Sequence, residues 1–282
     1  MNISLWPACV KTHTFEQQLI AASNAGFSHV PIGLTTYNSL KASGETNQSI
    51  LSMAADNNVK LGHFDGFSAW APVRFNDDFP AAAKAVFDIN TQACLDICDQ
   101  LQLPAICATG TYFYRQFEPA QLAECFAQFC QQARALNIRV DLEFLPMWGI
   151  PTLDEAWSIV KNSAADNAGI LLDTWHFLKG KPNMALLESL PAGSITSVQL
   201  ADAMLTAQSD DLFEECLRYR KPPGEGELNL HQILSILANK GGVMDIGPEI
   251  FSDQLDLLDA TTAAQHCYSQ SLKTLHNAGW HI

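Results

Sequence analysis

Short apolar runs of β-strand character alternate with helical segments along the whole chain, and this alternation constrains the fold more than any other feature. Eight strand-like runs occur, at residues 3–5, 30–33, 59–63, 105–108, 140–144, 170–173, 195–200 and 243–249. The segments between them have helical periodicity. After Pro119, which suits a first helical turn, Leu122, Phe126 and Phe129 recur at helical spacing. The alternation predicts parallel strands joined by helices.

Eight strand–helix units fit within 282 residues at about 35 residues each, which is the size of a βα unit in a closed barrel. A doubly wound open sheet is the alternative. Such a sheet normally has a glycine-rich loop after its first strand, and residues 4–8 read SLWPA. No linker or low-complexity segment divides the chain. The sequence therefore predicts an α/β protein with a (β/α)8 TIM barrel fold, as a single domain over residues 1–282.

Charge and hydropathy argue against several classes of protein. Asp and Glu number 30 against 16 Lys and Arg, a net charge of −14, which repels nucleic-acid phosphates and anionic lipids. No stretch approaches the roughly 18 apolar residues of a membrane span, and residues 1–14 hold no signal-peptide run. The eight cysteines include no C-x-x-C pair, so we expect buried thiols in a reducing compartment. We expect a cytoplasmic protein that binds neither nucleic acid nor membrane. The sequence leaves the oligomeric state open, a homo-oligomer included.

Polar residues end four consecutive apolar strands. Glu143 ends VDLE, Asp173 ends ILLD, Gln199 lies in SVQLAD and Glu249 lies in GPEIF. Burying several carboxylates in a barrel mouth is costly unless a cation compensates them. Three carboxylates and one amide oxygen form an oxygen-rich ligand set. Such a set suits one Mg²⁺ or Mn²⁺ ion and tolerates Co²⁺ or Zn²⁺.

Two long connections follow predicted strands, at about residues 64–78 and 202–228, the second with a short helix predicted near 210–217. Loops of this length in a compact domain are usually functional or disordered. Because each follows a strand, both should lie at the carboxyl-terminal face of the barrel, where such enzymes hold their active sites.

Five short segments resemble the xylose-isomerase-like barrels, a superfamily of sugar isomerases and epimerases, inosose and dehydroshikimate dehydratases, and apurinic endonucleases. They are LEFLP (142–146), DTWH (173–176), VQLAD (198–202), PGEG (223–226) and EIFSD (249–253). The resemblance implies that the metal ligands are Glu143, Asp173, Gln199 and Glu249. It also implies that His176 contacts substrate.

In this superfamily an arginine ahead of the P-G-x-G segment usually binds substrate oxygens. Arg218 and Arg220 both qualify. Gln199 departs from the epimerase pattern, which usually has histidine there, and is more like the dehydroshikimate dehydratases. His63, at the end of the third predicted strand, is either a further substrate contact or a structural histidine.

The chemistry that the resemblance implies is removal of a proton next to a carbonyl, with a metal ion stabilising the enediolate as a Lewis acid. Glu143 and Glu249, on the fifth and eighth strands, face each other across a closed barrel and could each serve one face of a substrate. Returning the proton elsewhere gives epimerisation or isomerisation. If a β-hydroxyl leaves with help from His176 or an arginine, the outcome is dehydration.

The leading hypothesis is a divalent-metal-dependent isomerase or epimerase of a small carbohydrate-like substrate, a sugar or polyol. The alternative is a metal-dependent dehydratase (lyase) of a cyclic keto-polyol or keto-acid such as inosose or dehydroshikimate. An apurinic endonuclease is disfavoured because it needs several metals and many histidines, whereas the fourth strand ends ATG. A non-catalytic carbohydrate-binding or scaffold role is the remaining class.

Overall fold

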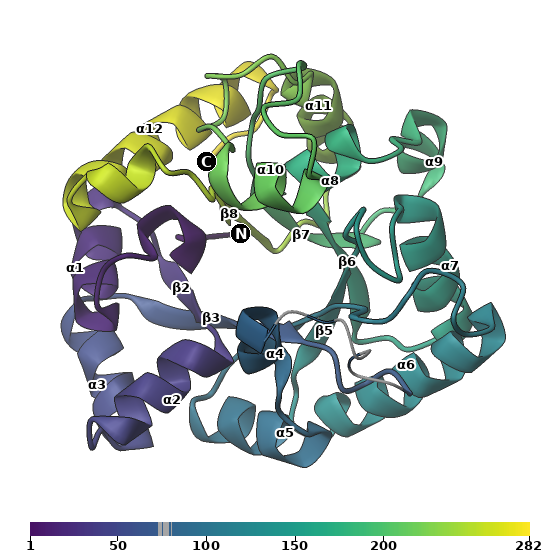
Figure 1. The fold of residues 1–282 in the computed structure, drawn as a ribbon, viewed down its shortest axis with the longest axis horizontal. Helices are drawn as coiled ribbons and strands as arrows, with labels where there is room; N and C mark the ends of the chain where they lie inside the picture. The colour runs from purple at the N-terminus through teal and green to yellow at the C-terminus, as the bar shows by residue number, and fades with distance from the viewer. Residues whose placement is uncertain (73–74, 76–78, 80) are drawn as a thin grey trace.

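The computed structural model describes residues 1–72, 75, 79 and 81–282. Within these residues eight parallel strands pair in the order β1-β8-β7-β6-β5-β4-β3-β2. A bridge between Ser4 and His29 joins the two end strands, so that the sheet is a nearly closed barrel surrounded by helices (Figure 1). The predicted (β/α)8 TIM barrel is confirmed.

The strands are β1 (Asn2–Ile3), β2 (His29–Ile32), β3 (Lys60–Phe67), β4 (Ala105–Ala108), β5 (Arg139–Glu143), β6 (Ala168–Asp173), β7 (Ile195–Leu200) and β8 (Asp245–Pro248). The α-helices are α1 (Phe15–Ala25), α2 (Leu34–Ala42), α3 (Asn47–Asp56), α4 (Ala81–Phe87), α5 (Thr91–Gln100), α6 (Pro119–Arg134), α7 (Leu153–Ser163), α8 (Thr174–Lys179), α9 (Met184–Ser189), α10 (Leu212–Arg218), α11 (Leu230–Lys240) and α12 (Ala260–Asn277). Two short 3-10 helices span Pro7–Val10 and Leu255–Leu257.

One predicted strand boundary is wrong in a way that matters for the site. The third strand was predicted to end at residue 63, but β3 continues to Phe67. The long connection predicted at 64–78 therefore starts later, and its residues 73–74 and 76–78 lie outside the described part of the chain. The helix predicted near 210–217 is confirmed as α10, and α6 begins at Pro119 as predicted.

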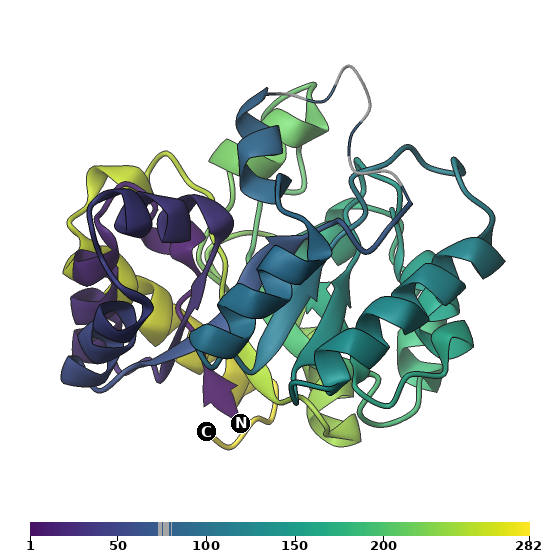
Figure 2. The ribbon, with the colours of Figure 1, turned by 90° about the horizontal axis from the view of Figure 1, so that it is seen from below.

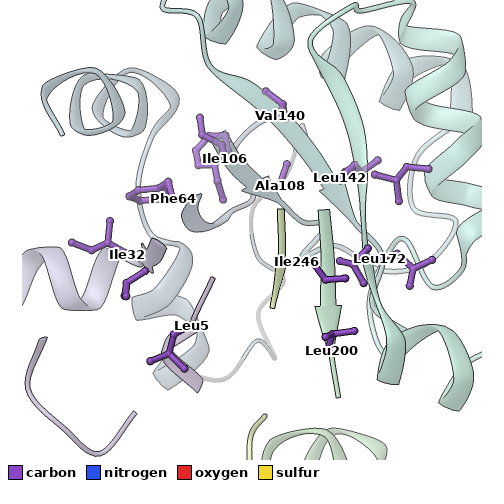
Figure 3. Packing of buried hydrophobic residues seen from close by; sticks show 14 of the residues in the cluster. Leu5, Ile32, Phe64, Ile106, Ala108, Val140, Leu142, Leu172, Leu200 and Ile246 are labelled. Atoms are coloured by element: carbon purple, nitrogen blue, oxygen red, sulfur yellow. The ribbon is translucent and has the colours of Figure 1, made fainter. Parts of the chain in front are cut away.

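Side chains alternate between the barrel interior and the helical layer, as the pleat of a strand requires. On β5, Val140 and Leu142 pack in the main hydrophobic cluster between strands and helices (Figure 3). Asp141 and Glu143 are also buried, but they bond to side chains of other strands in the barrel interior. This alternation places the carboxylates on the inner face of the sheet.

A polar network fills the lower part of the barrel interior. Asp141 accepts hydrogen bonds from Arg139 at 2.8 Å and from Ser197 at 2.7 Å, and it lies 2.8 Å from His63 Nε2. Burial alone would raise the pKa of Asp141, but Arg139 and His63 hold it well below its usual range. The network satisfies these buried charges below the barrel mouth.

The two termini lie at one end of the barrel, and α4 and α10 lie at the other (Figure 2). Viewed down the short axis, these two helices flank the barrel centre (Figure 1). Each helix follows a strand, so together they border the mouth at the carboxyl ends of the strands. Within the described residues, no helix is long and apolar enough to cross a bilayer.

Candidate metal and active site

A cavity of about 360 Å³ opens at the barrel mouth. Its charged and polar side chains come from the ends of the strands or just after them, from α8 and from the segment after α10: Asp65, Thr109, Glu143, His176, Arg220 and Glu249. Its apolar wall comes from the connecting loops and from α4 and α10: Ala83, Val86, Phe87, Leu145, Met147, Trp148, Phe213, Leu217 and Phe251. The polar and apolar parts of the lining together suit a small polar molecule whose surface also includes C–H groups.

Asp173 is fixed by its own backbone surroundings. It ends β6 and caps α8, and its Oδ1 accepts hydrogen bonds from the backbone N–H groups of Trp175 at 2.6 Å and His176 at 3.1 Å. Its Oδ2 accepts from Arg220 Nη1 at 2.6 Å. Burial would raise the pKa of Asp173, but the Arg220 guanidinium beside it holds the pKa below its usual value. Asp173 is therefore an ionised carboxylate at neutral pH.

Glu143, Asp173 and His176 converge on one point. One ligand atom from each lies within 4.8 Å of the others, with His176 Nε2 at 3.5 Å from Glu143 Oε1 and 3.7 Å from Asp173 Oδ2. Burial lowers the pKa of His176 to about 4, so the imidazole is neutral at pH 7. Arg220 Nη2, which can only donate, lies 3.4 Å from Nε2, a contact that favours the tautomer with Nε2 unprotonated. Three acceptors facing each other favour a cation between them.

Gln199 tests whether these residues fit a metal ion. It is paired in register with Asp173 and is 0% exposed, yet neither its amide oxygen nor its amide nitrogen has a hydrogen-bond partner among the described residues. A buried amide without partners is costly. A divalent cation held by the neighbouring carboxylates would satisfy the amide oxygen, so the donor set fits such an ion.

Glu249 follows β8 and lines the same cavity as Glu143. Burial raises the pKa of Glu249 well above its usual value, and burial with the nearby carboxylates of Asp173 and Asp65 raises the pKa of Glu143 to about 8. Burial therefore favours the protonated form of both glutamates in the metal-free protein. A bound cation would lower both pKa values.

The structure separates the two arginines that the sequence could not distinguish. Arg220 is 1% exposed and bonds Asp173, and its Nη1 also lies 3.4 Å from Glu249 Oε2. The Arg218 side chain is 47% exposed and pairs on the surface with Glu214 and Asp253. Only Arg220 of the two lines the cavity.

The structure places His63 away from the cavity lining. Its Nε2 lies 2.8 Å from Asp141 and 3.1 Å from Ser197, and its ring packs on Trp6 at 5.2 Å between centroids. Of the two roles that the sequence left open, this position favours the structural one.

The sequence analysis missed two residues of the site. Asp65 occupies the mouth position on β3, because that strand runs four residues further than predicted. Burial raises the pKa of Asp65 to about 6. Cys107 on β4 donates its thiol hydrogen to Glu143 Oε2 at 3.3 Å. The available signal for Asp65 was an acidic residue two positions after the predicted end of the third strand.

Among solved structures, the protein described as IOLI with a bound zinc atom has a TM-score of 0.81 at 16% identity, and 98% of each chain is covered. An L-ribulose 3-epimerase has a TM-score of 0.70 at 16% identity, covering 98% of this chain and 95% of the other. At these identities the likeness concerns the fold alone.

Sequence relatives include isomerases and dehydratases. An inosose isomerase of Halalkalibacterium halodurans is 30% identical over 210 residues, covering 72% of this chain and 73% of the relative. The 3-dehydroshikimate dehydratases of Pseudomonas aeruginosa and Pseudomonas putida are 32% and 25% identical, over 48% and 85% of this chain. The matched regions are only 21% and 36% of the length of those two relatives. The family model described as xylose isomerase-like TIM barrel matches residues 19–275, and the chain belongs to that family.

Proposed function

We propose that the protein is a divalent-metal-dependent isomerase or epimerase of a small keto-sugar or keto-polyol, acting by proton removal next to the carbonyl. The observation that carries the proposal is the convergence of Glu143, Asp173 and His176 within 4.8 Å, next to the strand that holds the unpartnered buried Gln199, at the base of the cavity in the barrel mouth. The inosose isomerase relative, similar over most of both chains, supports the same substrate class.

The ion would be held by the carboxylates of Glu143, Asp173 and Glu249 and by the amide oxygen of Gln199, with His176 Nε2 beside them. When bound, a divalent ion supplies Lewis-acid stabilisation of the negative charge that develops on the substrate oxygens. Asp173 is ready for this role because the α8 N-terminus and Arg220 keep it ionised.

Proton transfer falls to the two glutamates. Glu143 ends β5 and Glu249 follows β8, so the carboxylates approach the cavity from two different parts of the barrel wall. One takes a proton from the carbon next to the carbonyl, and the other returns it to the opposite face or to the neighbouring carbon. Arg220 lines the same cavity, and its guanidinium holds substrate oxygens during the transfer.

Dehydration is the second candidate, and two observations favour it. The ligand position on β7 is a glutamine, as the resemblance to dehydroshikimate dehydratases implies, and dehydroshikimate dehydratases are among the sequence relatives. The first step is the same proton removal. The glutamate that has taken the proton would then give it to the departing β-hydroxyl, which leaves as water, with Arg220 as a hydrogen-bond donor beside it.

One experiment tests the proposal and separates the two outcomes. Protein reconstituted with Mn²⁺ is incubated in D₂O with ketoses, an inosose and dehydroshikimate, with an EDTA-treated sample as the control. Isomerisation or epimerisation should give a product of unchanged composition that carries deuterium next to the carbonyl. Dehydration of dehydroshikimate should give an aromatic product with strong ultraviolet absorbance. Metal-independent turnover, or no deuterium and no water loss with any compound, would refute the proposal.

A further inference from the structure

Asp65 is a carboxylate in the candidate active site that the proposed chemistry does not use. It lies on β3 among the cavity-lining residues and is partly accessible. Its side chain makes no hydrogen bond and no ion pair with any described residue, whereas its backbone pairs in the β3–β4 ladder. A carboxylate that is largely removed from water and has no protein partner is costly, and a ligand in the cavity would supply the missing hydrogen bonds.

The backbone directs Asp65 toward the same space as Glu143. Asp65 pairs in register with Cys107, and the thiol of Cys107 donates to Glu143 in the barrel interior. Residues paired in a parallel ladder present their side chains to the same face, so Asp65 also points inward.

The charges around the cavity do not balance. Four carboxylates face it or lie under it, those of Asp65, Glu143, Asp173 and Glu249. Arg220 is the one cationic side chain among the described lining residues, and its guanidinium is already bonded to Asp173. Arg220 and a divalent ion would supply three positive charges against these four negative ones. Asp65 is the carboxylate without a compensating charge, because it neither pairs with Arg220 nor belongs to the proposed metal ligands.

A surplus carboxylate of this kind selects among substrates. It accepts hydrogen bonds from hydroxyl groups and repels a carboxylate or phosphate. Across the cavity, Leu145, Met147, Trp148 and Phe213 offer an apolar surface to the carbon–hydrogen face of a compact molecule. Among the described lining residues Arg220 is the one cation that a substrate acid group could meet, and the carboxylates of Asp173 and Glu249 already share its charge.

We propose that Asp65 binds neighbouring hydroxyl groups of an uncharged keto-polyol and excludes keto-acids from the site. This inference rests on the proposed function and narrows it to the neutral substrates, an inosose rather than dehydroshikimate. It runs against the similarity to the dehydroshikimate dehydratases, so the two compounds give a direct test.

The test measures binding of an inosose and of dehydroshikimate by calorimetry, using Mn²⁺-loaded wild type, Asp65→Asn and the control variant Asp166→Asn. Asp166 is an exposed carboxylate paired with Arg134, so its replacement changes the net charge equally but far from the cavity. Wild type should bind the inosose more tightly. Asp65→Asn should weaken inosose binding about tenfold or more, the loss of one charged hydrogen bond, and should strengthen dehydroshikimate binding. The control should match wild type.

Asp65→Glu keeps the charge but displaces the carboxylate, so it should weaken inosose binding and still reject dehydroshikimate. It serves as the second variant if Asp65→Asn fails to fold, which circular dichroism will show. Wild type that binds the inosose no better than dehydroshikimate, or an Asp65→Asn protein with wild-type affinities, would overturn the inference. Because these are binding measurements, they decide the inference separately from the proposed reaction, which fails if turnover does not need the metal or if no compound is turned over.

Discussion

Replacing Arg220 by methionine gives the sharpest test of how the site is held together. The Arg220 side chain is 1% exposed, and it neutralises Asp173, which is 0% exposed, at 2.6 Å. Removing one partner of a buried ion pair costs about 3–5 kcal/mol, because the other charge is left buried without compensation. The same variant loses the hydrogen bonds from the guanidinium to the carbonyl oxygen and the sulfur of Cys216. We therefore expect Arg220→Met to lower the free energy of unfolding by about 3–5 kcal/mol in EDTA.

The matched control is Arg218→Met, two residues away. The guanidinium of Arg218 pairs with two carboxylates on the surface, where solvent screens the interaction. The unfolding curve of Arg218→Met should therefore overlay that of wild type.

The assay is urea unfolding at pH 7 in EDTA, repeated with Mn²⁺ at a hundredfold excess over its Kd, where metal binding adds about 2.7 kcal/mol to the free energy of unfolding. In kinetics, Arg220→Met should lose an amount on the order of 1–3 kcal/mol in kcat/KM, as for one lost charged hydrogen bond. If Arg220→Met is no less stable than Arg218→Met in EDTA, the buried-pair reasoning is refuted.

Four further predictions follow from the same geometry. Glu143→Gln and Glu249→Gln should each abolish turnover and leave the circular dichroism spectrum intact; a crystal structure with the ion bound elsewhere would contradict the ligand assignment. Gln199→His should shift metal preference toward Zn²⁺ and Co²⁺. Its metal affinity should also fall more steeply than that of wild type between about pH 7 and 5.5, because histidine titrates near 6.5. Metal titrations that are identical for the two proteins at two pH values would show that residue 199 is not a ligand. Metal-free protein should lose stability as pH rises from 5 toward 8. The pKa of Glu143 is raised to about 8 in the folded state, so the folded protein keeps a proton that the unfolded chain releases. Melting temperatures at both ends of this range, with and without Mn²⁺, check the sign; the ion binds the deprotonated carboxylate and should stabilise the protein most at pH 8. His63→Gln should lower the free energy of unfolding by about 1–3 kcal/mol, because the buried Asp141 loses a hydrogen-bond partner. Its effect on KM should be smaller than that of Arg220→Met, and a larger effect on KM would indicate that His63 contacts the substrate.

The sequence by itself determined the barrel and the ligand candidates, and the reason is local. A strand that is buried on both faces is a continuous apolar run in the sequence, and the polar residue that ends the run can be read from the same segment. Parallel strands all bring their carboxyl ends to the same side of the barrel. Glu143, Asp173 and Gln199 could therefore be grouped without knowing any contact, and the structure does bring Glu143 and Asp173 together and pairs Gln199 with Asp173.

Two decisions belonged to the tertiary structure. The length of β3 was one, because the Asp-Gly pair at 65–66 is typical of a strand end and only pairing with β4 carries the strand on to Phe67. That extension puts His63 inside the barrel and Asp65 at the mouth. The other was the choice between Arg218 and Arg220. Arg218 ends α10, whereas the backbone N–H of Arg220 is anchored on the carbonyl of Phe251 beside β8. Which arginine enters the site depends on a contact between residues 31 positions apart in the chain, and no local pattern of sequence encodes it.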